Sequence, residues 1–214
     1  MNYRITGTGS CTPDITKKNS DFLQNKFLDR DGSDIQSSNP EIIEKFKSIT
    51  GITERRYASD KLNCSDLATD AARNAIIDSK IDQETLDFII VAHNAGDISC
   101  NSGQVDTLPS IASKVKAKLK IKNPSCVAYD IICGCPGWVE GMIQAKSFIN
   151  SGMASKCLII GCDTLSRILD ENDRDSMIYA DGSGATILEK DTSYNGGILS
   201  VSYTHLRAHE TGWY

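Results

Sequence analysis

The sequence lacks the features that would place it in a membrane or on nucleic acid. It has no apolar run approaching the ~18 residues of a membrane-spanning helix, and residues 1–5 show no signal-peptide core. It also has no run of lysine and arginine, and its net charge of -5 argues against the concentrated basic surface that nucleic acid requires. We therefore expect a cytoplasmic protein that binds neither membranes nor nucleic acid.

Extremes of composition are absent as well. Hydrophobic residues make up 40% and charged residues 24% of the 214 positions, close to the average of soluble globular domains, which disfavours disordered, collagen-like and coiled-coil classes. A chain of this length can bury a core without disulfides, as one domain or two small ones. We expect the eight cysteines to be reduced thiols, most of them buried as small apolar residues.

Apolar runs of strand length alternate with helical patterns along the chain. Strands are predicted at residues 87–92, 126–132, 156–162, 185–188 and 197–201. Helices are predicted after a cap at Ser65, from Thr107 with Pro109 in the first turn, and over residues 136–150 with Gly152 as the stop. The alternation predicts an α/β fold with helices layered on a mostly parallel sheet, whose closing strand pair is expected to be antiparallel.

Several segments suggest no binding site. Gly7-Thr8-Gly9 lacks the third glycine and the following helix of a dinucleotide fingerprint, so a tight turn is predicted there. Residues 17–48 are polar and rich in turn residues, as expected of a surface excursion. Residues 170–175 lack the glycine and terminal glutamate of a calcium loop and are interpreted as a solvated loop. Residues 181–184 are interpreted as a glycine turn that feeds a strand.

The segment with the most chemical information runs from a predicted strand directly into a predicted helix. Cys135 falls at this junction, immediately before Pro136, which is expected to be the first helical residue. A thiol at this place lies near unpaired backbone N–H groups and the positive end of the helix dipole, and both favour the thiolate. The pattern is typical of a cysteine nucleophile.

Two other interpretations of this segment stay open on the residues alone. In the first, Cys135 merely caps a helix and Cys133 is its buried neighbour. A metal site would combine Cys133 and Cys135 with Cys126 or His93, although no second cysteine pair has zinc-like spacing. We predict no metal.

A set of motifs in fixed order gives the chain a family resemblance over about residues 1–201. The motifs are Gly7-Thr8-Gly9-Ser10, Thr50-Gly51-Ile52 with Glu54-Arg55-Arg56, Tyr129-Asp130, Cys135-Pro136-Gly137-Trp138, residues 160–167 and residues 181–185. With these residues the chain resembles the β-ketoacyl-acyl-carrier-protein synthase III family of thiolase-fold condensing enzymes. The resemblance implies the front half of a thiolase-like fold, a layered, mostly parallel sheet with flanking helices.

The resemblance also implies an activity in fatty acid biosynthesis. The cysteine matched by Cys135 takes the acyl group of an acyl-CoA, its backbone N–H helps to hold the oxyanion, and the acyl-enzyme condenses with decarboxylated malonyl-carrier protein. Acyl-CoA is then a substrate, no cofactor is tightly bound, acyl carrier protein is a partner, and a homodimer is expected. Arg174 matches a CoA-binding arginine, and Leu108 and Tyr179 match the acyl pocket.

Some family features are missing from the chain. The catalytic His and Asn of the family belong to a second half of the fold, and this chain ends before it; His93, His205 and His209 match neither motif. We therefore expect a truncated chain that accepts an acyl group but does not condense it. The family's CoA-stacking tryptophan corresponds to Lys45 or Phe46, and an arginine to Ile49.

Residues 202–214 have no clear period and are expected to be a frayed or foreign tail. Two alternatives to a synthase III function remain. One is another Claisen enzyme of the same scaffold, such as a hydroxymethylglutaryl-CoA synthase-like or secondary-metabolite enzyme. The other is a non-catalytic module that uses its cysteines for metal binding or is a pseudoenzyme subunit.

Overall fold

A five-stranded mixed sheet forms the centre of the molecule. The computed structural model describes residues 3–100 and 103–193. The strand order is β1-β9-β8-β4-β7, in which β8 (Lys156–Thr164), β4 (Phe88–His93) and β7 (Val127–Ile132) are parallel. β9 (Asp181–Lys190) runs antiparallel to β8 and to β1 (Tyr3–Cys11). The predicted layered α/β sheet is confirmed. The predicted closing pair includes residues 197–201, which lie outside the described residues, so its antiparallel pairing stays a prediction.

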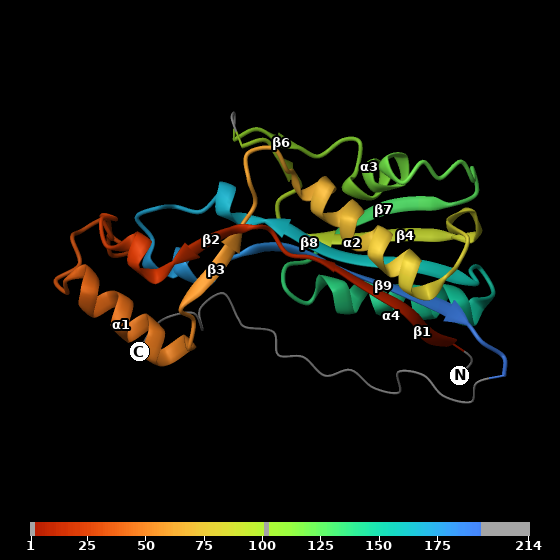
Figure 1. Cartoon of the computed structure of the whole chain (residues 1–214), viewed down its shortest axis with the longest axis horizontal. Coiled ribbons are helices and arrows are strands. Elements are labelled where there is room, and N and C mark those ends of the chain that lie inside the picture. The colour runs from red at the N-terminus through yellow and green to blue at the C-terminus, as the bar shows by residue number, and fades with distance from the viewer. Residues whose placement is uncertain (1–2, 101–102, 194–214) are drawn as a thin grey trace.

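Helices cover both faces of this sheet (Figure 1). On one face, α2 (Cys64–Ser79) and α3 (Ile111–Lys118) share a buried cluster with Ile89, Val91 and Ile160 of the strands. On the other face, α4 (Gly137–Ser151) packs against alternate residues such as Ile90 and Ile159. Because successive strand residues point to opposite faces, β4 and β8 are buried on both sides.

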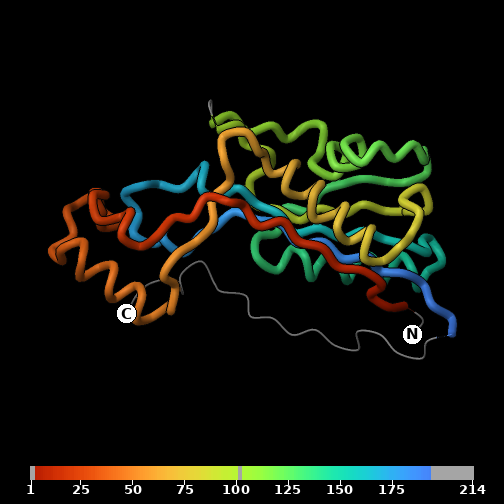
Figure 2. The backbone as a smooth tube through the Cα atoms, viewed as in Figure 1, coloured from red at the N-terminus to blue at the C-terminus, as the bar shows by residue number. Residues whose placement is uncertain are grey.

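A smaller lobe extends from one end of the large sheet (Figure 2). It holds α1 (Asn39–Thr50), the hairpin of β2 (Ile15–Lys18) and β3 (Glu54–Tyr57), and the 3-10 turns η1 (Asn19–Phe22) and η4 (Arg174–Ile178). Its core is a separate cluster centred on Phe22, Phe46 and Met177. The remaining short elements are η2 (Gln83–Thr85), β5 (Asp97–Ile98), β6 (Val105–Asp106) and η3 (Leu165–Arg167).

The turn predicted at Gly7-Thr8-Gly9 is wrong, because these residues lie inside β1. α2 packs so closely on this strand that a Cβ atom at Gly7 would lie 2.4 Å from the backbone oxygen of Ala75, and one at Gly9 2.2 Å from that of Ala71. The absence of a side chain at Gly7 and Gly9 therefore allows α2 to pack directly on β1. The facing residues Ala71, Ala72 and Ala75 are fully buried, as the predicted helical face required.

Two helix starts differ from the prediction. α2 is capped by Asn63, which precedes the predicted cap Ser65 in the chain, because Asn63 and Asp66 form a reciprocal capping box. α3 begins only at Ile111, after the cap Ser110, whose hydroxyl accepts the backbone N–H of Ser113. Pro109 thus precedes the helix and follows a cis peptide bond.

No helix within residues 3–100 and 103–193 combines the length and the apolar character that a bilayer span requires.

Candidate active site

Cys135 lies in the short turn that joins β7 to α4. Gly134 has φ of 57°, a conformation that favours glycine, and its carbonyl accepts the N–H of Gly137 at 3.0 Å. Pro136 is the N-cap and α4 begins at Gly137, so the prediction of Pro136 as the first helical residue is one residue early. Cys135 is exposed and Cys133 is half-buried. The turn thus presents the Cys135 side chain to solvent just before the first turn of a helix.

Close packing fixes the start of α4 behind this turn. A Cβ atom at Gly137 would lie 2.9 Å from Cβ of Ala92 on β4, so the helix begins in contact with the strand. The first turn of an α-helix has N–H groups without intrahelical partners and carries the positive end of the helix dipole. A negatively charged sulfur or oxygen next to Gly137 is favoured by both.

A half-buried carboxylate, Asp130, and a buried histidine, His93, connect the elements beside the turn. Asp130 of β7 accepts the N–H groups of Ile111 and Ala112 at 2.7 and 2.8 Å, which ties α3 to the sheet. The Nε2 atom of His93 lies 3.1 Å from Asp130 Oδ2, and Nδ1 of His93 accepts the N–H of Gly96 at 3.0 Å. Because Nδ1 is an acceptor, Nε2 carries the proton and donates to Asp130.

Two more carboxylates lie at the same end of the sheet. Asp163 of β8 accepts both the backbone and the side-chain N–H of Asn94, and burial raises the pKa of its carboxyl. Asp181 accepts the N–H of Ala58 and both the N–H and the hydroxyl of Ser166. Asp163, Asp181 and Asn94 were not predicted as site residues. For Asp163 and Asn94 the available signal was their position at the carboxyl ends of the buried parallel strands β8 and β4, where ligand sites gather. Asp181 is buried at the start of β9 rather than in the predicted turn.

Several of the other cysteines have raised thiol pKa values. Burial raises the pKa of Cys157 to about 12, and it also raises the pKa of Cys126. The pKa of Cys162 is raised by the hydrogen bond from Cys64 and by burial. Cys100 is exposed, but its thiol donates to Asp60, which raises its pKa. A thiol with a raised pKa has little thiolate at neutral pH.

The described residues contain no group of three or more His, Cys, Asp or Glu side chains arranged to hold a metal ion. Cys126 precedes β7 and Cys133 follows it, so a whole strand separates them. The ring nitrogens of His93 contact Asp130 and Gly96. The geometry therefore gives no support to the alternative zinc site.

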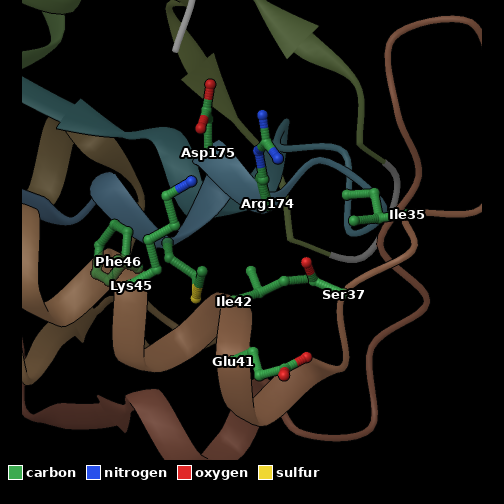
Figure 3. Close-up of a pocket in the computed structure, with 9 residues that line it drawn as sticks. Ile35, Ser37, Glu41, Ile42, Lys45, Phe46, Arg174 and Asp175 are labelled. Carbon is green, nitrogen blue, oxygen red and sulfur yellow. The ribbon is translucent and has the colours of Figure 1, made fainter. Parts of the chain in front are cut away.

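A cavity of about 270 Å³ lies between α1 and η4. Figure 3 shows Arg174 and Asp175 on one side of it and Ile42, Lys45 and Phe46 of α1 on the other. The structure thus brings together the predicted CoA arginine and both candidates for the tryptophan position. The lining combines the cations of Lys45 and Arg174 and the carboxylates of Glu41 and Asp175 with an aromatic ring and aliphatic side chains, so the cavity offers both charged and apolar contacts to a ligand.

The two residues assigned to the acyl pocket do not join this cavity. Leu108 precedes α3 and is 83% exposed, and Tyr179 follows η4 and is 40% exposed. Cys135 is not among the residues that line the cavity either. The sequence-predicted site residues are therefore not gathered in one cavity, and the assignments of Leu108 and Tyr179 stay predictions.

Comparison with known proteins gives one consistent family. A model of the family described as 3-Oxoacyl-[acyl-carrier-protein (ACP)] synthase III matches residues 129–205. β-Ketoacyl-[acyl-carrier-protein] synthase III of Neisseria gonorrhoeae (strain NCCP11945) is 37% identical over 190 residues, which cover 88% of this chain and 52% of that protein. The protein of the same name from Alkalilimnicola ehrlichii is 37% identical over 218 residues, covering 100% of this chain and 58% of the relative.

The solved structures agree. The crystal structure of 3-oxoacyl-[acyl-carrier-protein] synthase III from Aquifex aeolicus VF5 has a TM-score of 0.72 and 30% identity, over 89% of this chain and 55% of that one. The corresponding enzyme of Thermus thermophilus has a TM-score of 0.70 at 30% identity, over 89% of this chain and 52% of that one.

The chain is similar to β-ketoacyl-[acyl-carrier-protein] synthase III in sequence and in fold. The predicted resemblance and the predicted thiolase-like fold are therefore confirmed. The chain spans only 52% and 58% of the length of the two synthase III relatives named above. The tail at residues 202–214, with His205 and His209, lies outside the described residues.

Proposed function

We propose that this chain is the acyl-accepting part of a synthase III-like acyltransferase and that Cys135 is its nucleophile. The observation that carries the proposal is the position of Cys135, exposed between β7 and the start of α4, in a chain similar to synthase III. A helix start has N–H groups without intrahelical partners, which can stabilise negative charge, and a thiolate is both a good nucleophile and a good leaving group.

In the proposed reaction, the Cys135 sulfur attacks the thioester carbonyl of an acyl-CoA. A new C–S bond forms at Cys135, the bond to CoA breaks, and CoA leaves as its thiolate. Backbone N–H groups near the start of α4 would stabilise the oxyanion of the intermediate. The whole protein would then condense the acyl group with a malonyl-carrier protein that loses CO₂, in fatty acid biosynthesis, using a His and an Asn that this chain does not supply.

The cavity beside Arg174 is the proposed site of the CoA nucleotide. Arg174 can pair with phosphate, while Lys45 occupies or adjoins the place where the family has a tryptophan. We infer that the ring stacking used by the family is replaced here by charge or by Phe46. No tightly bound cofactor is required by this reaction.

The exposed edge of the sheet supports a homodimer as the assembly. β7 is an edge strand of the described sheet, and it carries the exposed apolar residues Val127 and Ile132, 48% and 72% exposed. Leu108, 83% exposed, precedes the helix that packs beside β7. An apolar edge strand pairs readily with a second chain. Acyl carrier protein is proposed as the other partner and the cytoplasm as the location.

The test is to incubate the chain with acetyl-CoA and to locate the adduct by peptide mass spectrometry. We expect an acetyl group on Cys135 in the parent and in Cys133→Ala, and none in Cys135→Ala. Cys133 is the matched control, because it lies two residues away in the same turn. An unmodified Cys135 in the folded parent would contradict the proposal.

A further inference from the structure

Asn94 and Asp163 meet at the carboxyl ends of two neighbouring parallel strands. β4 and β8 pair with Ala92 opposite Gly161, so the residues that follow are brought together from 69 positions apart. The backbone N of Asn94 donates to Asp163 Oδ1 at 2.9 Å, and its Nδ2 donates to Oδ2 at 2.6 Å. Both oxygens of one carboxylate thus hold one residue, which fixes the orientation of the Asn94 carboxamide.

The other end of this carboxamide lies near the turn that carries Cys135. Since Nδ2 of Asn94 is bonded to Asp163, its Oδ1 is directed elsewhere, and a Cβ atom at Gly134 would lie 3.4 Å from it. Gly134 adopts the left-handed φ of 57° immediately before Cys135. The carboxamide therefore lies against the peptide whose conformation sets the direction of the Cys135 side chain.

The surroundings of the Asp163 carboxylate disfavour its negative charge. Burial is the largest cause of its raised pKa; the two hydrogen bonds from Asn94 and the nearby His93 lower the pKa, and Asp181 raises it. Within the described parts of the chain, no Lys or Arg forms an ion pair with Asp163. A half-buried carboxylate that accepts two hydrogen bonds from one exposed residue, and whose charge burial disfavours, is a candidate for a role in the site.

We propose that Asn94 is a positioning residue for the Cys135 nucleophile and that Asp163 holds Asn94 in place. This inference rests on the proposed function of Cys135. Asn94 restrains the Gly134 peptide, so that the thiolate and the N–H groups at the start of α4 keep the geometry that acyl transfer requires. Asp163 acts through Asn94 and has no contact with the substrate in this account.

The test compares Asn94→Ala, Asp163→Asn and the double variant with the parent. We expect the rate of Cys135 acetylation at saturating acetyl-CoA to fall ~10-fold or more in each single variant, because small misplacements of reacting groups are costly. The acetyl-CoA concentration for half-maximal rate should change little. The double variant should react no more slowly than the slower single variant, since both substitutions disrupt the same hydrogen-bonded pair of Asn94 and Asp163. Asn74→Ala is the matched control, an exposed carboxamide on α2 that bonds to Ser10.

Exchanging the two side chains of the Asn94–Asp163 pair distinguishes a positioning role from a role in folding. Asn94→Asp alone should be slow, because two carboxylates would face each other, whereas Asn94→Asp with Asp163→Asn restores a donor opposite an acceptor and should regain the rate. Melting temperatures of all variants should stay within about 3 °C of the parent. Unchanged rates in both single variants overturn the inference, as does a loss of rate that follows the melting temperature and is not regained by the reversed pair.

Alkylation of Cys135 by iodoacetamide keeps this test independent of the proposed function. If acetyl-CoA fails to modify the parent, the acyltransferase proposal fails, while slower alkylation in Asn94→Ala would still support positioning of the thiol. If the parent is acetylated and the variants react at the parent rate with both reagents, only the positioning inference fails.

Discussion

Two regions of the molecule contrast with each other: the packed contact of α2 with β1 and the open turn that holds Cys135. Both depend on glycine, but for different reasons. Gly7 and Gly9 are needed because the α2 backbone leaves no room for a Cβ atom, whereas Gly134 is needed for its left-handed φ. At the first contact Ala71, Ala72 and Ala75 of α2 are fully buried, whereas the second leaves a thiol exposed beside a helix start. Stability and reactivity are thus assigned to different parts of one sheet.

The largest effect is expected from a substitution at the packed contact. Gly9→Ala would place a methyl group 2.2 Å from the backbone oxygen of Ala71, which cannot move without shifting α2. We expect a loss of about 3 kcal/mol or more in the free energy of unfolding, measured by urea denaturation. Gly184→Ala is the control, because a Cβ atom there meets nothing within 4 Å. Equal stability of the two variants would show that this contact is not tight.

A smaller effect is expected where loops near the carboxyl end of β8 are held by one guanidinium. Arg167 donates to Asn63 Oδ1 at 2.8 Å and to the carbonyl oxygens of Ser59, Leu62 and Ile98. Arg167→Met leaves these acceptors without their donor and should cost about 2 kcal/mol of unfolding free energy.

Arg167→Lys should recover only part of the stability lost in Arg167→Met, because an ammonium lacks the planar fork of the guanidinium. The exposed Arg73→Met on α2 serves as the control for removal of a charge, since its ion pair with Asp70 is at the surface. A cost for Arg73→Met as large as that for Arg167→Met would contradict the assigned role.

A charged substitution on the edge strand β7 should change the association state of the chain and not its folding stability. Ile132→Lys places a charge at a residue that is 72% exposed, so unfolding free energy at low concentration should change by less than about 0.5 kcal/mol. Sedimentation should instead show a shift toward monomer, since an edge lysine opposes strand pairing. The control is Ile77→Lys, 66% exposed on α2. If both variants keep the parent's association state, this edge is not the interface.

The smallest effect concerns the pH dependence of stability at Asp163. Because its pKa is raised in the folded state, the folded chain binds this proton more tightly, and stability falls as pH rises from the ordinary carboxyl value through the raised one. Asp163→Asn removes this dependence. Its stability relative to the parent should therefore increase between acidic and neutral pH, as measured by thermal unfolding across that range. A constant difference would contradict the assigned burial of the charge.

Local patterns sufficed for the main elements. The apolar runs that became β4 and β8 are buried on both faces, and the small residues of α2 all face the sheet. The strand-helix junction at Cys135 was visible for the same reason. The strand character of Gly7 and Gly9 was not visible, because the close approach of α2 is a tertiary requirement.

The contacts around the candidate site depend on register. Asn94 and Asp163 come together only because Ala92 lies opposite Gly161 in neighbouring parallel strands. The sequence shows that Asn94 and Asp163 each lie at the end of an apolar run, but it does not show that the two residues contact each other. Likewise, Lys45 and Arg174 share a cavity through the packing of α1 on η4, far apart in the chain. The family resemblance indicated these residues where local pattern did not.

The most direct test of the account is a time course of acetylation at every cysteine of the folded chain. With acetyl-CoA as the donor, peptide mass spectrometry should find the acetyl group on Cys135 first, and Cys135→Ala should abolish it without loss of fold. Buried Cys64, Cys157 and Cys162 should stay unmodified. Acetylation of Cys133 or Cys100 at the rate of Cys135, or an adduct that persists in Cys135→Ala, would contradict the claim that Cys135 is the nucleophile.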